Sequence, residues 1–196
     1  YGNSGVADQW NITGTWNSGG NNYFKGVYHL PDGTTLAALD STSNAYNGTI
    51  TSATAVTGQV GGGANFDGTG QRIVMSGMPN YTSAFTIGGW VKSGGSQDAT
   101  WGGTIIGKRS ICANATTDFP VSLTITSTGN ISANLDRGND YSLDSTIAYT
   151  MSNPTTTWHY VTVTYTANGT SYLYVDGTQV GSVATNFTIA TTNMSW

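Results

Sequence analysis

Residues 158–183, WHYVTVTYTANGTSYLYVDGTQVGSV, constrain the fold of this chain more than any other stretch. The first run alternates apolar and polar side chains with a period of two, which is typical of a half-buried strand. Asn168-Gly169 and Asp176-Gly177 then separate three such runs. Both dipeptides favour hairpins because they tolerate the positive φ that type I′ turns require. The stretch therefore predicts a three-stranded antiparallel meander, and the rest of the chain must supply its partner strands.

The rest of the sequence reads as further short strands separated by turn residues. Residues 1–22 are polar and read as a linker or the end of a preceding domain. The stretch 84–92 alternates in the manner of a central strand, and 119–136 reads as a hairpin that turns at Gly129-Asn130. With no convincing long helix, this spacing predicts an all-β sandwich or barrel. The other expected strands lie at 24–30, around 66 and 73, and at 104–109, 145–150 and 186–190.

The composition excludes several classes of partner. Charged residues make up 8% of the chain, the net charge is −4, and there are only six Lys plus Arg. We therefore expect binding neither to nucleic acid nor to anionic lipid. No apolar run approaches the roughly 20 residues of a membrane span, so no membrane insertion is expected. The neutral, hydroxyl-rich composition favours an extracellular or cell-surface location. The start, YGNSG, is no signal peptide, so an exported protein would be a processed piece.

Seven pieces of the chain together carry a family resemblance. In order they are GVYHL, LDSTSNAYNGT, GGGANFDG, FTIGGWVK, TIIGK, WHYVTVTY and LYVDGTQVG. They resemble the laminin G-like jelly roll of the concanavalin A-like lectin/glucanase superfamily, and they occur in that family's order. This resemblance implies two antiparallel sheets in a jelly-roll sandwich over 23–196, often a structural calcium ion, and frequently carbohydrate binding. The family also includes adhesion and spacer modules. Family members usually finish with an acidic strand, so we expect that the last strand is missing here or supplied elsewhere.

The first ten residues, YGNSGVADQW, resemble the closing strand of a domain that precedes such modules in large surface proteins. Neighbouring domains in a longer chain are therefore expected.

The inventory of reactive side chains argues against an enzyme. Glycosidases of this fold use paired carboxylates, usually Glu. The ten acidic residues here are all Asp, and no D-x-D pair lies on an expected strand. The sequence has no G-x-S-x-G motif, and His29 and His159 read as packed histidines with one hydrogen bond each. Cys112, the only cysteine, reads as a small buried hydrophobe.

A calcium ion is the expected cofactor, with a structural role. Asp40 and Asn44 lie in one loop, DSTSN, and Asp32 lies just upstream. Carboxylate and amide oxygens are the ligands that calcium prefers. The competing interpretation is that these side chains form Asx-turns and bond their own backbone.

Glycan binding needs an aromatic platform with fixed polar groups at its rim. Such groups gather in the loops, where an aromatic is less easily explained as core. Trp90 and Trp158 lie on strands and read as core or sheet-face packing. The candidate ligand-binding residues are Trp101 with Asp98, Tyr141 with Arg137, Asn139, Asp140 and Asp144, and Tyr46.

These observations favour a non-catalytic extracellular module that binds polysaccharide or glycoconjugate. The alternative is a structural or adhesive module of a larger surface assembly with protein partners, because an unpaired sheet edge invites strand addition. An endo-acting glycosidase or lyase is disfavoured by the absence of Glu.

Overall fold

The computed structural model describes residues 12–16, 23–30, 34–94, 103–108, 120–137, 145–189 and 196 of the chain. These residues hold one four-residue helix, α1 (Ile12–Thr15), and twelve strands, all of whose pairings are antiparallel. None of the described helices is long and apolar enough to cross a membrane. The strands are β1 (Gly48–Thr51), β2 (Thr54–Thr57), β3 (Gly62–Asn65), β4 (Arg72–Met75), β5 (Ala84–Val91), β6 (Gly103–Lys108), β7 (Val121–Ile125), β8 (Asn130–Leu135), β9 (Ser145–Thr150), β10 (His159–Thr166), β11 (Gly169–Val175) and β12 (Thr178–Thr185).

The chain divides into two compact units. The first comprises Tyr1–Asn65 and Arg72–Met78, and the second comprises Phe66–Gln71 and Pro79–Trp196. The first unit contains two small sheets, β1-β4 and β2-β3, and an isolated bridge between Tyr28 and Asp40. The second contains two four-stranded sheets, β12-β11-β10-β5 and β6-β7-β8-β9. The predicted division of the chain at residue 22 stays a prediction.

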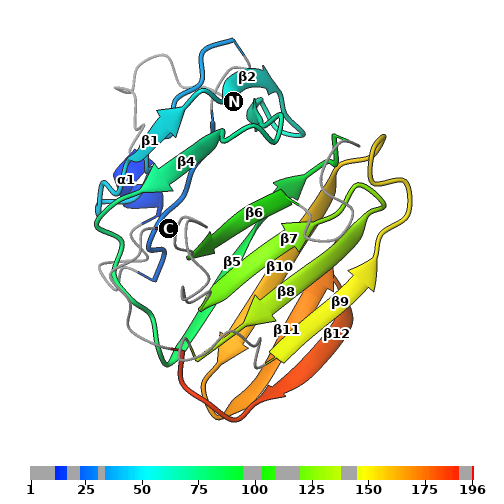
Figure 1. The fold of residues 1–196 in the computed structure, drawn as a ribbon. Helices are drawn as coiled ribbons and strands as arrows, with labels where there is room; N and C mark the ends of the chain where they lie inside the picture. The colour runs from blue at the N-terminus through cyan, green and yellow to red at the C-terminus, as the bar shows by residue number, and fades with distance from the viewer. Residues whose placement is uncertain are drawn as a thin grey trace, which may run out of the picture. The chain divides into compact units, whose positions relative to one another are not determined.

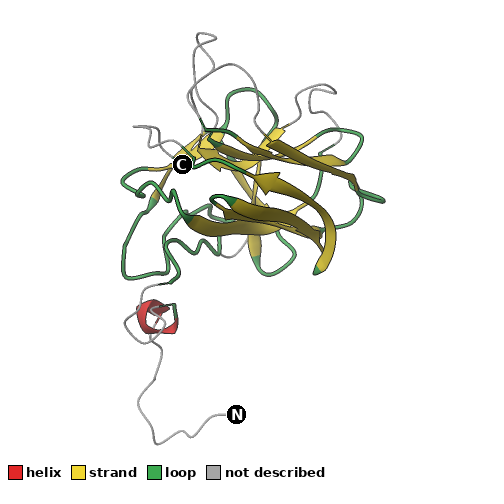
Figure 2. Cartoon of the chain, turned by 90° about the horizontal axis from the view of Figure 1, so that it is seen from below, coloured by secondary structure: helices red, strands yellow, loops and turns green. Residues whose placement is uncertain are grey.

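The second unit is the two-sheet antiparallel jelly-roll sandwich. Figures 1 and 2 show its strands in two layers, one sheet facing the other. The inner faces are lined by aliphatic side chains that alternate with outward polar ones, as a half-buried strand requires. The core cluster takes Leu123, Ile125, Ile131, Ala133, Ile147 and Met151 from one layer, and Val161, Val163, Leu173 and Val175 from the other.

The edge strands β9 and β12 approach each other closely at one side of the sandwich. The Ser145 hydroxyl donates to the Ala184 carbonyl over 3.4 Å. A Cβ atom on Gly181 would lie 2.4 Å from Cγ2 of Ile147, so only glycine permits this approach. This edge is where a pocket opens, as described below.

The predicted meander is confirmed as β10, β11 and β12. Side chains at 159, 161, 163 and 165 are buried, and those between them are more exposed. Asp176 and Gly177 both have positive φ, 51° and 79°, as a type I′ turn needs. At the other turn only Asn168 is left-handed, with φ of 53°, so that hairpin does not use a type I′ pair. Gly169 is needed there because a Cβ would lie 2.8 Å from the Thr166 methyl.

Three predicted strands differ from the structure. Residues 24–30 make only the bridge at Tyr28, because the N–H of Val27 binds the Asp40 carboxylate instead of a strand partner. The strand at 84–91 ends the order of its sheet among the described strands, so it is an edge strand there. Residues 186–189 are not a strand, although Phe187 and Ile189 are buried.

Candidate binding site

The outer face of the sheet β12-β11-β10-β5 carries a group of aromatic side chains. Trp90 of β5 and Tyr160 of β10 lie opposite each other in the register. Their ring centroids are 5.4 Å apart in an edge-to-face arrangement, and 45% and 41% of these residues are exposed. Tyr174 and Tyr172 of β11 continue this face opposite Thr162 and Thr164, with ring centroids 6.3 Å apart. We call Trp90, Tyr160, Tyr172 and Tyr174 the outer aromatic face.

Sequence reasoning missed the outer aromatic face, because the strand pattern at Trp90 indicates only core or sheet-face packing. Opposite residues of an antiparallel pair share a face. Gly88 lies opposite Thr162 and Thr86 lies opposite Thr164, so these threonine residues belong to the same face as the rings. A Cβ on Gly88 would lie 2.7 Å from the Thr162 hydroxyl, so a larger residue does not fit at this position without a shift of its neighbours. The sequence does carry a signal, since Trp90 alternates in phase with Thr86 and Gly88.

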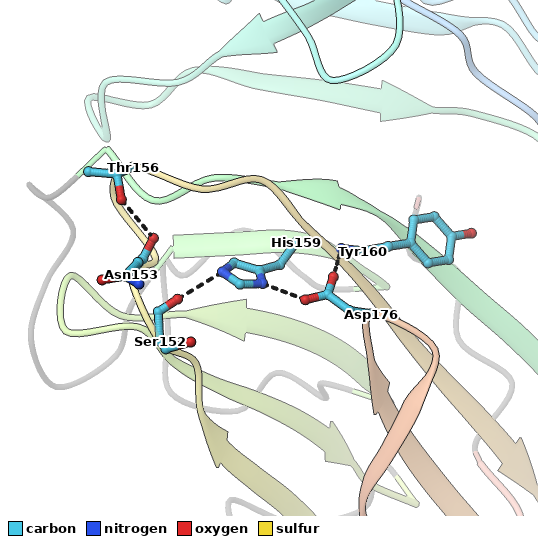
Figure 3. Close-up of polar contacts among 6 residues, drawn as sticks. All are labelled: Ser152, Asn153, Thr156, His159, Tyr160 and Asp176. Atoms are coloured by element: carbon cyan, nitrogen blue, oxygen red, sulfur yellow. Dashed lines mark hydrogen bonds and ion pairs between the residues drawn. The ribbon is translucent and has the colours of Figure 1, made fainter.

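His159 sits on the inner side of β10, next to this face but pointing the other way (Figure 3). Its Nδ1 lies 2.7 Å from Oδ2 of Asp176, and its Nε2 lies 2.9 Å from the Ser152 carbonyl oxygen. Asp176 also accepts the Tyr160 N–H over 2.9 Å. His159 is thus a packed histidine, as predicted, but it makes two hydrogen bonds instead of one.

Both acceptors of His159 lack a proton to donate, so both bonds form when the ring carries two protons. The ring and Asp176 then form an ion pair. Partial burial acts to raise the pKa of Asp176, but the hydrogen bonds from His159 and Tyr160 and the charge of His159 outweigh it. The pKa of Asp176 therefore lies below its ordinary value of 3.8.

This lowered pKa gives a pH-dependent prediction for Asp176→Asn. An acid whose pKa is lower in the folded state stabilises that state above the unfolded pKa, and this contribution is lost as pH falls through the folded pKa. Because half of the Asp176 side chain is exposed, we expect a cost of only about 1 kcal/mol near neutral pH. Thermal melts should show a gap between wild type and variant from pH 5 to 7 that closes below about pH 3.8. A gap that stays constant down to pH 3 would contradict this role.

The Asp40 loop has the contacts of an Asx-turn within a larger network. Oδ1 of Asp40 accepts the N–H groups of Val27 and Thr42 over 3.0 and 2.9 Å. Oδ2 accepts the Thr42 hydroxyl and the Tyr46 N–H over 2.8 and 3.0 Å. The Asn44 amide donates to the Lys25 carbonyl over 3.1 Å.

These contacts do not fit a calcium ion at Asp40. A carboxylate offers about four acceptor positions, and all four are used here by protein donors. Asn44 points its donor nitrogen, not its oxygen, toward the neighbouring carbonyl of Lys25. In the parts of the chain that the structure describes, no three His, Cys, Asp or Glu side chains gather where they could hold a metal ion. Calcium stays a prediction, with Asp32 outside the described residues.

Most of the predicted glycan contacts fall on residues that the structure does not describe, namely Asp98, Trp101, Asn139, Asp140, Tyr141 and Asp144. Two of the predicted contacts are described. The Arg137 guanidinium lies 5.6 Å from the centroid of the Phe187 ring, which is within the range of a cation–π contact. Tyr46 is half-buried, and its carbonyl accepts the Tyr28 hydroxyl over 2.6 Å. Their roles in ligand binding stay predictions.

The two facing four-stranded antiparallel sheets make this chain a jelly-roll module. The model of the concanavalin A-like lectin/glucanases superfamily matches residues 67–196. The chain therefore belongs to this superfamily, and the expected resemblance is confirmed. Among curated protein sequences, none matches this chain.

Solved structures with the same fold include two toxin chains. The binding domain of Paraclostridial Mosquitocidal Protein 1 has a TM-score of 0.58 at 15% identity, covering 87% of this chain and 42% of that one. Botulinum neurotoxin type C, whose cell entry depends on interaction with two ganglioside molecules, has a TM-score of 0.55 at 16% identity, covering 89% and 42%. This chain thus spans about two fifths of both toxin chains.

A third structure is closer in length. Domain 4 of AbnA, an extracellular arabinanase from Geobacillus stearothermophilus, was solved in complex with arabinotriose. It has a TM-score of 0.51 at 18% identity, covering 81% of this chain and 75% of that one. At these identities the three likenesses establish the fold.

Proposed function

We propose that this chain is a non-catalytic module that binds carbohydrate, as a polysaccharide or glycoconjugate, outside the cell or at its surface. The observation that carries this proposal is the outer aromatic face. Trp90 and Tyr160 are large, flat and exposed, and they lie side by side on a rigid sheet.

The chemistry of this face matches that of a sugar chain. A sugar ring presents an apolar C–H face, which an aromatic ring can cover, and hydroxyls at its edge, which need polar partners. Successive outward positions along a strand are about 6.8 Å apart, so rings at several of them make an extended platform. Thr162 and Thr164 of β10 lie opposite Tyr174 and Tyr172 of β11 in the register, so threonine residues share this face with the rings. Such a surface suits internal residues of a chain.

The carboxylates support a role without catalysis. The sequence has no Glu. Asp40 is held by four hydrogen bonds from its own unit, and Asp176 is paired with His159. Neither carboxylate has a second carboxylate among its hydrogen-bond partners. An acid and a nucleophile on either side of a glycosidic bond are therefore not supported by these residues.

The comparisons support the same proposal. One solved structure of this fold belongs to a toxin whose cell entry depends on gangliosides, and another contains arabinotriose. The arabinanase is extracellular, and the low charge of this chain suits that environment. A glycan is therefore the partner that we propose first.

Removal of the two exposed rings is expected to weaken glycan binding. Affinity electrophoresis in gels that contain plant and algal polysaccharides would first identify a polymer that retards the wild type. We expect Trp90→Ala and Tyr160→Ala each to weaken this binding about tenfold, which corresponds to about 1.4 kcal/mol. The matched control is Phe66→Ala, because Phe66 is exposed to the same extent, 45%, but lies outside the outer aromatic face.

Retardation that is equal in all three variants would place glycan binding elsewhere on the chain. If no polysaccharide or glycan array retains the wild type, the proposed role of the outer aromatic face in carbohydrate binding is wrong. Exposed Trp and Tyr are also enriched where proteins contact proteins. In that case light scattering would show whether the outer aromatic face mediates self-association, as an adhesive module requires.

A further inference from the structure

A pocket of about 220 Å³ opens at the edge of the sandwich where β9 and β12 lie side by side. The pocket lies on the inner side of the sheet β12-β11-β10-β5, whereas the outer aromatic face is on the opposite side of that sheet. Tyr149 of β9 lies opposite the buried Ile131, so its side chain belongs to the inner face. Because β9 is an edge strand, Tyr149 stays 39% exposed there. The pocket is lined by Tyr149, Met151, Ser152, His159, Val175, Asp176, Thr178 and Val180.

The lining has an apolar part and a polar part. Met151, Val175, Val180 and the Tyr149 ring provide apolar surface, while the Asp176 carboxylate and the Thr178 hydroxyl provide hydrogen-bonding groups. A ligand with one apolar face and several hydroxyls satisfies both parts. A purely apolar ligand would leave the carboxylate without water, which is costly.

The Asp176 carboxylate is held in place but not saturated. Oδ2 faces His159 and Oδ1 accepts the Tyr160 N–H. A carboxylate has about four acceptor positions, so these two bonds leave about two for ligand donors. Half of the side chain is exposed, which gives a ligand access to them. Asp176 differs in this respect from Asp40, whose four positions are occupied.

The Asp176 carboxylate is the one acidic group of the described pocket lining, and the His159 ring lies 2.7 Å from its Oδ2. An anion would meet this carboxylate, and a cation would compete with His159 and Tyr160 for its oxygens. The described lining contains no other ionisable group apart from the Tyr149 phenol. A neutral ligand rich in hydroxyls therefore fits better than a cation or an anion.

The size restricts the ligand further. Sites for drug-sized molecules have volumes of roughly 300–1,000 Å³. A pocket of about 220 Å³ is smaller than that range. It has room for one sugar ring but not for several.

We propose that this pocket binds one neutral sugar ring, the terminal residue of a carbohydrate chain. The Asp176 carboxylate accepts two ring hydroxyls, the Thr178 hydroxyl bonds a third, and Tyr149 with Val180 covers the apolar side of the ring. This inference rests on the proposed carbohydrate function and deepens it. The outer aromatic face then binds along a chain, and the pocket recognises its end.

The test is an NMR titration of the isotope-labelled chain with free glucose, galactose, mannose, xylose and arabinose, one at a time. We expect one of these sugars to shift the amide signals of Met151, Thr178 and Val180 with millimolar affinity. Asp176→Asn and Thr178→Val should each weaken that binding at least tenfold. Thr178→Val keeps the side-chain shape, and Thr178 is exposed, so it guards against loss of folding. Phe66→Ala is the control, because Phe66 is exposed but belongs neither to the pocket lining nor to the outer aromatic face, and it should leave the titration unchanged.

The outcomes separate this inference from the proposed function. If sugars shift only residues of the outer aromatic face, or if polysaccharide retards the wild type while no free sugar reaches the pocket, the pocket inference is wrong and the carbohydrate function stands. Pocket shifts without any polysaccharide retardation would support the pocket and overturn the role of the outer face. If methylammonium competes for the pocket better than every sugar, Asp176 is a cation site and the inference is overturned.

Discussion

Asp40→Ala is expected to destabilise the first unit by about 3–5 kcal/mol, because it removes a buried carboxylate that accepts four hydrogen bonds. Each buried donor that loses its partner costs about 1–3 kcal/mol. Water can reach the half-buried N–H groups of Val27 and Tyr46, which keeps the total below the sum. Hydrogen exchange measures the effect directly. Protection of the Val27, Thr42 and Tyr46 amides should fall roughly 100-fold or more.

Asp67→Ala is the matched control for Asp40→Ala. Asp67 likewise accepts the N–H and the hydroxyl of a Thr two residues on, Thr69, but it is exposed. We expect Asp67→Ala to leave the exchange of the other amides unchanged. EDTA should also leave the wild type unchanged, because Asp40 has no acceptor position to spare. A drop in melting temperature on chelation would contradict this account and support the predicted calcium ion.

The meander could be predicted because its signals are local. The period-two pattern and the two turns lie within 26 residues, and the Asp176-Gly177 turn has the backbone angles that its sequence favours. The strands at 103–108, 121–135 and 145–150 follow for the same reason. A local alternating pattern predicts which side of a strand is buried, whichever strands of the opposite sheet cover that side.

The strand predicted at 24–30 does not form, because the Asp40 side chain binds a backbone N–H group that a partner strand would otherwise bind. The sequence GVYHL has strand propensity, but the Asp40 carboxylate takes the Val27 N–H and the Val27 carbonyl accepts the Ser41 N–H. Short Asp side chains often capture backbone donors in this way. The spacing of residues 27 and 40 does not predict whether the Val27 N–H binds a carboxylate or a backbone carbonyl of another strand.

The outer aromatic face could be predicted only in part. That Trp90 faces outward follows from its phase with Thr86 and Gly88. That it meets Tyr160 depends on the pairing of β5 with β10, which brings together residues 70 positions apart in the sequence. The pocket at β9 and β12 depends on contacts between the two sheets, which no strand pattern encodes. Sequence motifs therefore could not predict sites that are built from non-local contacts.

Leu173→Ala is expected to destabilise the sandwich by about 2–5 kcal/mol, with a thermal shift of roughly 5–20 °C. Leu173 is fully buried at the middle of β11, opposite Val163 on one side and Gly181 on the other. Gly181 has no side chain that could fill the space left by Leu173, and its backbone is already in close contact with Ile147. The cavity should therefore stay open, and the cost should lie toward the upper end of the range.

Leu39→Ala makes the same truncation at a leucine that is 63% exposed, and we expect it to change the stability by no more than about 0.5 kcal/mol. Hydrogen exchange of the Val163 amide would assign the Leu173→Ala effect to the sandwich. A loss below about 1 kcal/mol would mean that the sheets collapse onto the vacated space. In that event the distance between the layers would change, and the edge pocket beside Met151 and Val175, which belong to the same core cluster, would change with it. The sugar titration repeated on Leu173→Ala would then detect the collapse, because the pocket depends on both sheets keeping their separation.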